Sequence, residues 1–554
     1  MEQKIKNWIK EILKIEGDFV LVHPKDIKNG DYTFISSLEK PAEDLEKLKK
    51  NKLVEIEKIE MVGRFINLYL SRKFFASSVE EILNQGGNVG KNDFFTGKKI
   101  MIEYTDPNPF KPFHIGHLMS NAIGESISRL MEFSGAETSR ANYQGDLGLH
   151  VAKAIYGLLQ NEKLQAKIGS HNLQAENIGR AYAFGAEAYE IDKKAKKEID
   201  KINKKLYDKK DKKIIEIYDW GFKVTMDAFQ DLYETLGTEF DFYFLESQMA
   251  PIGEQIVRAN TGKIFEKSDN AIVFKAEKYD PKLHTRVFIT SEGLPTYETK
   301  ELGLAEEKFK TEPNLDLSVV VTASEQMDYM RVVAKAISLI NPEHEKKMKH
   351  ITHGMMRLSS GKMSSRKGNV VTGESLLNDV RDAILEKMTD REFSNEEREQ
   401  VASSVAVSAI KYSILKQGIG GDIIYDFENS ISFEGDSGPY LQYSFARANS
   451  VLEKAKKENI LPDPHAFPAE TFEVEKLLYK FPEIVLRSAK EYEPHYIANY
   501  LIEVARAFNS FYGNNLIIDK KNKTSSYKVA LTFAFTFVMK SGLHLLGIKA
   551  PEKM

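Results

Sequence analysis

The segment KKIMIEYTDPNP (98–109) and the residues after it constrain the fold more than any other part of the chain. Its apolar residues end in a cluster of Pro, Asp and Asn, which is typical of a buried parallel strand that runs into a loop. From Ile115 onward, apolar residues recur at 123, 127, 130 and 131, the spacing of one helix face. A second strand-like run, SRANY (139–143), follows a glycine break. Strand, loop, helix and strand make a βαβ unit, so the sequence predicts a doubly wound α/β domain.

The chain has 554 residues, enough for roughly three or four domains. Residues 1–92 predict a small α+β domain with a first helix, the strand-like runs DFVLVH and FINLYL, and a second helix, SSVEEILNQ. The Gly- and Asn-rich stretch NQGGNVGKNDF marks its boundary. The α/β domain then extends over 93–372, with a helical insertion at about 160–280 and a further buried strand in LDLSVVVTASE. Residues 373–554 predict an all-α domain.

Two segments could be mistaken for functional signals. The lysine-rich run 192–213 carries an apolar stripe, Ile199, Ile202 and Leu206, which favours a surface helix with a solvated face over a dedicated RNA-binding tract. The apolar run VALTFAFTFVM (529–539) is shorter than the roughly 20 residues that cross a bilayer. We therefore interpret it as a buried helix and expect no membrane contact.

Composition excludes several kinds of site. Hydrophobic residues make up 42% and charged residues 29% of the chain, an ordinary globular balance. The net charge of −3 gives no global basic field, although a local basic surface would suffice to bind RNA. The absence of cysteine excludes disulfides, thiolate zinc sites and cysteine nucleophiles, and it fits a cytoplasmic protein.

The string HIGH (114–117) places two histidines around a glycine at the start of the predicted helix. A metal site would need further ligands, and no acidic residue stands at helical spacing beside His114 and His117. A pair of helix-capping histidines is the structural alternative. At the carboxyl end of a strand, however, a helix N-terminus offers free N–H groups, and Gly116 permits close approach to the backbone. The motif therefore favours an ATP triphosphate, with Lys111 as a second phosphate cation unless it is simply solvated.

A second motif, LSSGKMSSRKGNVVTG (358–373), carries several cationic and hydroxyl side chains on a Ser- and Gly-rich loop. A solvated basic loop is the alternative that composition alone does not reject. A mobile Lys362 can swing onto a pyrophosphate leaving group and neutralise charge that develops in the transition state. Ser364 and Ser365 would assist as hydrogen-bond donors to the phosphates.

HIGH followed by KMSSR (362–366) resembles the paired signatures of class I aminoacyl-tRNA synthetases. The surrounding segments resemble the arginyl-tRNA synthetases: IEYTDPNPFKPFHIGHLMSNAIGES, GLPTYETKELGLAEEKF, YDFENSISFEGDSGPYLQYSFARANSVLEKA, RFINLYL and the closing LLGIKAPEKM. The resemblance implies a Rossmann-type catalytic domain, an N-terminal tRNA-binding domain and a C-terminal anticodon-binding domain. It implies ligation of L-arginine to tRNA(Arg) through an arginyl-adenylate, with ATP and Mg²⁺ and release of AMP and diphosphate. We expect a cytoplasmic monomer.

The resemblance also implies an arginine pocket. A buried guanidinium must be met by carboxylates in planar geometry, because an unpaired buried cation is very costly. The matching positions for the pocket are Glu103, Asn108, Tyr297, Glu301 and Gln326. The family normally has Asp, preceded by Arg, where this chain has Glu301 and Lys300. It also departs from the family at Ala323, at Tyr329, where histidine is usual, and at Phe445. Without the motifs, these acids would be interpreted as surface residues and Tyr297 as a packing residue.

The anticodon positions implied by the resemblance are Tyr440, Tyr443, Arg447 and Met554. The first three fall on one helix face, where aromatic rings can stack on unpaired bases. Core packing is the alternative for the two tyrosines. Four other interpretations remain open: a cysteinyl enzyme, which would be expected to hold zinc; a class I lysyl enzyme; a nucleotidyltransferase of similar core; and an inactive RNA-binding paralogue.

Overall fold

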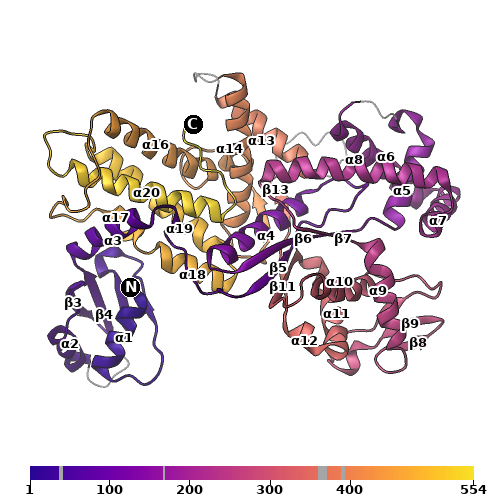
Figure 1. Ribbon diagram of the computed structural model, residues 1–554, viewed down its shortest axis with the longest axis horizontal. Coiled ribbons are helices and arrows are strands. Elements are labelled where there is room, and N and C mark those ends of the chain that lie inside the picture. The colour runs from indigo at the N-terminus through magenta and orange to yellow at the C-terminus, as the bar shows by residue number, and fades with distance from the viewer. Residues whose placement is uncertain (36–40, 166–168, 360–370, 389–393) are drawn as a thin grey trace.

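The computed structural model describes residues 1–35, 41–165, 169–359, 371–388 and 394–554. Figure 1 shows three parts: a small domain at the N-terminus, an α/β domain with helical and antiparallel additions, and a helical domain that ends the chain. The α/β domain centres on a parallel sheet in the order β12-β11-β5-β6-β7. Its strands are β5 Lys99–Glu103, β6 Glu137–Gln144, β7 Phe242–Leu245, β11 Leu317–Ala323 and β12 Met348–His353.

The strand order fixes where a ligand can bind. From β5 the chain moves one way to β6 and β7, and it later returns to the other side of β5 to form β11 and β12. The order therefore reverses between β5 and β11, and open α/β sheets bind ligands at the carboxyl ends of strands beside such a reversal. The predicted doubly wound domain is confirmed, and Glu103 lies at this edge as the last residue of β5.

The part expected as a helical insertion, 160–280, is only partly helical. Three helices, α6, α7 and α8, precede β7, which pairs with β6 in the central sheet, and a small antiparallel sheet, β8 to β10, follows. These strands have three or four residues each, too short for a clear alternating pattern in the sequence. The elements are α4 Ile115–Phe133, α5 Leu149–Gln160, α6 His171–Ile191, α7 Lys193–Asp208, α8 Lys212–Leu236, α9 Glu246–Ala259, β8 Glu266–Ser268, β9 Ala271–Phe274, β10 Arg286–Ile289, α10 Tyr297–Thr311, α11 Met327–Ile340, α12 Pro342–Lys346 and β13 Met356–Leu358.

Helix α7 has the amphipathic character expected of the lysine-rich run. Ile199, Ile202 and Leu206 are buried against the neighbouring helices, whereas Lys193 and Lys196 are exposed. The lysines thus form a solvated face, as the surface-helix interpretation expects.

The N-terminal domain is a four-stranded antiparallel sheet in the order β1-β2-β4-β3 with three helices. The predicted elements are present, and β2, β3 and α2 are additional. Glu483 of the helical domain holds this domain in place by accepting hydrogen bonds from Tyr32 Oη (2.7 Å) and the Glu2 backbone N–H (2.9 Å). The elements are α1 Glu2–Leu13, β1 Leu21–Val22, β2 Tyr32–Ile35, α2 Pro41–Lys50, β3 Ile56–Val62, β4 Phe65–Leu70 and α3 Arg72–Gln85.

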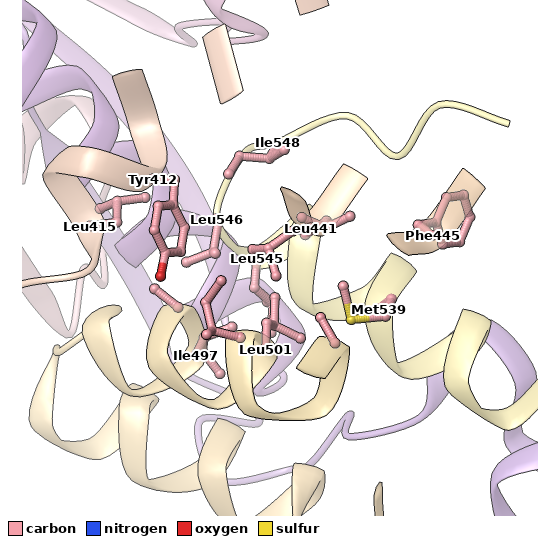
Figure 2. Close-up of a cluster of buried hydrophobic side chains, with 14 of the residues drawn as sticks. Tyr412, Leu415, Leu441, Phe445, Ile497, Leu501, Met539, Leu545, Leu546 and Ile548 are labelled. Carbon is pink, nitrogen blue, oxygen red and sulfur yellow. The ribbon is translucent and has the colours of Figure 1, made fainter. Parts of the chain in front are cut away.

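The C-terminal part is helical, and its core joins several helices around α20. In Figure 2, Tyr412, Leu441, Leu501 and Met539 point toward a common centre. The expected buried helix over 529–539 is confirmed as part of α20, and no helix among the described residues could cross a membrane. The elements are α13 Gly373–Lys387, α14 Asn395–Leu415, β14 Ile423–Tyr425, which pairs with β13, α15 Phe427–Ser430, α16 Gly438–Lys457, α17 Glu473–Leu478, α18 Phe481–Glu491, α19 His495–Asn514 and α20 Ser525–Leu545.

Helix α4 connects the catalytic sheet to the end of the chain. Ser126 Oγ donates to the Leu545 carbonyl at 2.7 Å, and Arg129 donates to the His544 carbonyl at 3.0 Å. Since α4 begins at the HIGH motif, its second half fixes the position of that motif relative to the helical domain.

Candidate functional site

The loop between β5 and α4 has an unusual backbone. Thr105, Asp106 and Phe110 have positive φ angles of 79°, 47° and 66°. Polar contacts hold the loop: the Thr105 N–H donates to Ser120 Oγ at 2.9 Å, and Asp106 Oδ1 accepts from the Tyr143 N–H at 2.8 Å. Non-glycine residues with positive φ angles have a strained backbone, and such residues cluster at ligand sites. The conformation of this loop therefore indicates a ligand site.

The two signature histidines stack on each other at the start of α4. Their ring centroids lie 3.5 Å apart with an interplanar angle of 19°. His117 Nδ1 accepts a hydrogen bond from the His114 N–H at 3.1 Å, so part of the capping alternative is present. A Cβ at Gly116 would lie 3.0 Å from the His114 ring. The group that approaches the Gly116 backbone closely is therefore the imidazole of His114.

The tautomer of His117 follows from this contact. Burial, together with His114 and Lys111 nearby, lowers the pKa of His117 well below its usual 6.5, so the ring is neutral at pH 7. A neutral ring whose Nδ1 accepts carries its proton on Nε2. Nε2–H is therefore the atom that can donate to a phosphate oxygen. Burial and Lys111 also lower the pKa of His114, and Lys111 itself lies 5.6 Å from the Tyr182 ring centroid.

A cluster of carboxylates lies at the carboxyl end of β5. Glu103 is 2% exposed and forms an ion pair of 2.5 Å with Lys308 of α10, which is equally buried. Glu301, one turn of α10 away from Tyr297, faces the same cluster, because the Glu103 charge acts on it. Burial and then Glu103 raise the pKa of Glu301 to about 8.

Two acids of this cluster lack an ion pair. Glu103 is paired with Lys308, and Glu246 of α9 forms a buried ion pair with Lys300 of α10. Glu301 forms no ion pair among the described residues, although Lys308 is close enough to lower its pKa. The same holds for Asp106, whose pKa is raised well above its usual 3.8 by burial and by Glu103. Two partly buried acids without an ion pair are suited to a positively charged ligand, which would favour their ionised forms.

The remaining predicted pocket residues are Tyr297, Gln326 and Asn108, which lie at the start of α10, beyond β11 and in the loop after β5. Tyr297 is 62% exposed at the start of α10, with the Lys300 ammonium 5.0 Å from its ring centroid. Gln326 lies just beyond β11 and contacts Tyr329. Asn108 Oδ1 accepts from the Gly145 N–H at 2.8 Å, so its amide N–H₂ is the group left to meet a ligand.

Lys111 lies within electrostatic range of both the signature histidines and one of the carboxylates. Lys111 lowers the pKa of both signature histidines, and on its other side it is close enough to influence the pKa of Glu246. Glu246 in turn contributes to the raised pKa of Glu301. The carboxylate Glu103 and the histidine His114 flank the same loop, between the end of β5 and the start of α4.

The second signature falls outside the described residues, and with it Lys362, Ser364 and Ser365. The first residues after it are described: Thr372 forms a β-bridge with His114, and the Gly373 N–H donates to the Phe113 carbonyl at 2.7 Å. Thr372 and Gly373 therefore lie directly beside the first signature.

The predicted anticodon residues of α16 form one network with α19. Arg447 donates to Asn509 Oδ1 at 2.5 Å and to Tyr443 Oη at 3.0 Å, and Asn509 donates to Tyr440 Oη at 2.9 Å. The Arg447 guanidinium also lies 5.2 Å from the ring centroid of Tyr512, which is 42% exposed.

Met554 is partly buried and packs against the core of the helical domain. Phe445, which departs from the resembling family, is a buried core residue there.

Sequence reasoning missed several residues of the site. Asp106, Lys308 and Glu246 were not predicted as site residues. Asp106 follows a strand as part of a turn, and Lys308 and Glu246 are typical of helices. In the helical domain, Asn509 and Tyr512 were missed, although their i, i+3 spacing places them on one helix face. The positive φ of Asp106 was not readable from the sequence, because aspartate is common in ordinary turns.

Comparison with known proteins agrees with this geometry. Residues 78–427 match the family model for tRNA synthetases class I (R), catalytic domain, and residues 441–554 match the DALR anticodon binding domain. An arginine–tRNA ligase of Clostridium perfringens is 31% identical over 93% of this chain and 90% of its own length. One from Clostridium kluyveri is 30% identical and covers 100% of this chain and 99% of its own.

The fold agrees as well. A structure of Thermus thermophilus arginyl-tRNA synthetase superposes with a TM-score of 0.80 at 22% identity, covering 100% of both chains. The chain therefore belongs to the arginyl-tRNA synthetases, the class I enzymes that join arginine to tRNA for protein synthesis.

Proposed function

We propose that the arginine side chain binds between Glu103 and Glu301, with Tyr297 and Gln326 beside it. The observation that carries this proposal is Glu301, a partly buried carboxyl group that forms no ion pair among the described residues. A guanidinium placed there would supply the missing charge in planar geometry. Lys308 holds Glu103 in place and leaves Glu301 as the acid whose charge is free for the substrate.

At the other end of the substrate, Asn108 would bind the backbone groups of arginine. The amide N–H₂ left free by the Gly145 contact suits the α-carboxylate, and a second lone pair of Oδ1 remains for the α-ammonium that the resemblance assigns to it. This places the carboxylate on the side of His114 and His117.

ATP would bind at the start of α4. A carboxylate oxygen of arginine attacks the α-phosphorus, the bond to the bridging oxygen breaks, and pyrophosphate leaves. His114 and His117 donate to the triphosphate, Gly116 supports the His114 ring, and Lys111 and Lys362 neutralise phosphate charge, with Ser364 and Ser365 assisting. Mg²⁺ would arrive on the phosphate oxygens of ATP. The described residues contain no group of three His, Asp or Glu side chains that could hold a metal.

In the second step, a ribose hydroxyl of the terminal adenosine of tRNA(Arg) attacks the adenylate carbonyl and AMP leaves. Tyr440, Tyr443, Arg447 and Met554 would contact the anticodon loop, where Tyr440 and Tyr443 offer stacking surfaces. We assign tRNA binding to residues 1–92 and 373–554 and catalysis to 93–372. We also propose that the protein acts as a monomer in the cytoplasm.

The test is ATP–pyrophosphate exchange with each amino acid, with and without tRNA(Arg). Exchange is expected with arginine alone among the amino acids, and in the presence of tRNA. His117→Asn should reduce the exchange rate by about 10²-fold, because a phosphate donor is lost. Exchange supported by lysine instead of arginine would contradict the pocket assignment, and unchanged exchange by His117→Asn would contradict the phosphate role. Lys201→Gln, on the solvated face of α7, is a matched control with no expected effect.

The pH dependence of the KM for arginine follows from Glu301. Its pKa is raised from an ordinary 4.5 to about 8, so in arginine-free enzyme the carboxyl group is protonated below pH 8. A guanidinium favours the ionised form, so binding releases a proton, and the KM should fall by up to about tenfold per pH unit from pH 6 to 8. The free energy of unfolding of the arginine-free enzyme should fall as the pH rises from 6 to 8, because only the folded state keeps this proton. The KM of Glu301→Gln should be independent of pH in this window, and an equal slope in both proteins would contradict the assignment.

A further inference from the structure

Tyr329 is a partly buried side chain that reaches Glu301 from a different helix. It is the third residue of α11, just beyond the carboxyl end of β11, whereas Glu301 is on α10. The phenol oxygen lies 3.4 Å from Glu301 Oε1 and 3.1 Å from Gln326 Oε1. The three residues thus form a chain of polar groups along one wall of the pocket.

Because the Tyr329 phenol has a single proton, the direction of the two hydrogen bonds is determined. One hydroxyl cannot donate to two acceptors, but the oxygen and nitrogen of the Gln326 amide have the same shape and can exchange places. With the amide turned, Gln326 Nε2–H donates to the phenol oxygen, and Tyr329 O–H donates to the Glu301 carboxylate. Burial, Glu301 and Glu103 raise the pKa of Tyr329, so the phenol keeps its proton and remains a donor.

The contact joins two of the positions at which this chain departs from the family pattern. Glu301 stands where the family has the shorter Asp, and Tyr329 where it usually has histidine. A glutamate has one more rotatable bond than an aspartate, so its carboxylate loses more freedom when it is held in one orientation. A donor on the neighbouring helix restricts that freedom before the substrate arrives.

We propose that Tyr329 is a positioning residue that holds the Glu301 carboxylate toward the guanidinium of arginine and compensates for the longer side chain. This inference rests on the proposed role of Glu301 in arginine binding. Tyr329 itself would act through Glu301 and would set how well arginine is bound rather than how ATP is bound.

The test is a steady-state analysis of tRNA charging by Tyr329→Phe, with the KM for arginine and for ATP measured from pH 6 to 9. Loss of a hydrogen bond to a charged group should raise the KM for arginine about tenfold and leave the KM for ATP unchanged. In Tyr329→Phe the fall of the arginine KM with rising pH should occur at higher pH. The reason is that the ionised Glu301 carboxylate has lost the hydrogen bond from the phenol. In the Glu301→Asp background, Tyr329→His should lower the arginine KM relative to Tyr329→Phe.

A purely structural role would not move the pH profile. An arginine KM and a pH profile equal to those of the parent protein would overturn the inference, as would an equal rise in both KM values. Glu301→Gln separates the two proposals: if it raises the arginine KM and Tyr329→Phe does not, the pocket stands and the positioning role fails. Tyr243→Phe, which removes an exposed hydroxyl on β7, is the matched control.

Discussion

Lys308→Met is expected to lower the free energy of unfolding by about 3–5 kcal/mol, because it leaves a buried carboxylate without its partner. Lys308 and Glu103 lie 2.5 Å apart with side chains only 2% and 3% exposed. The substitution would also leave Glu103 close to Glu301, and two neighbouring carboxylates without a cation repel each other. Urea denaturation followed by circular dichroism measures the change.

Two further variants make this result interpretable. In the double variant Glu103→Gln/Lys308→Met no unpaired charge remains at this pair, so most of the lost stability should return. Lys310→Met breaks the exposed pair with Glu307 on the same helix, and it should change stability by less than about 1 kcal/mol. A Lys308→Met protein as stable as the parent would show that Glu103 does not depend on this ion pair.

The position of the site could be predicted from the sequence because it depends on local order. A strand that ends in Glu103, a loop and a helix that begins after His114 follow one another directly, and the sheet places them at its carboxyl edge. The two signature histidines are three residues apart, so their proximity needed no long-range information. The all-α character of residues 373–554 was also predicted, and α14 and α20 there have 21 residues each.

The charge balance of the pocket could not be predicted in the same way. Glu103 meets Lys308, and Lys300 meets Glu246, only because α9 and α10 pack beside the strand ends. Viewed alone, each of these charged residues is typical of an exposed strand end or helix surface. β7 was missed for a different reason: it is four residues long and becomes recognisable only through its pairing with β6.

Glu301→Gln is expected to reduce the kcat/KM for arginine by about 10³-fold. The amide keeps the size of the side chain but removes the charge, so a guanidinium would be bound in a pocket whose other acid is already paired with Lys308. Loss of one partner of a buried charge pair costs about 3–5 kcal/mol, which corresponds to this change in rate. The KM for ATP should be unchanged, because the triphosphate would lie at His114 and His117.

Charging of tRNA with arginine compared with citrulline tests the central claim most directly. Citrulline has nearly the same shape, but a neutral urea group replaces the guanidinium. The parent enzyme should prefer arginine by about 10⁴-fold in kcat/KM, because a pocket built for a charged donor rejects an analogue that leaves its acid unpaired. In Glu301→Gln this preference should shrink to about tenfold. A ratio that is the same in both proteins would contradict the assignment of Glu301 as the carboxylate that selects the arginine side chain.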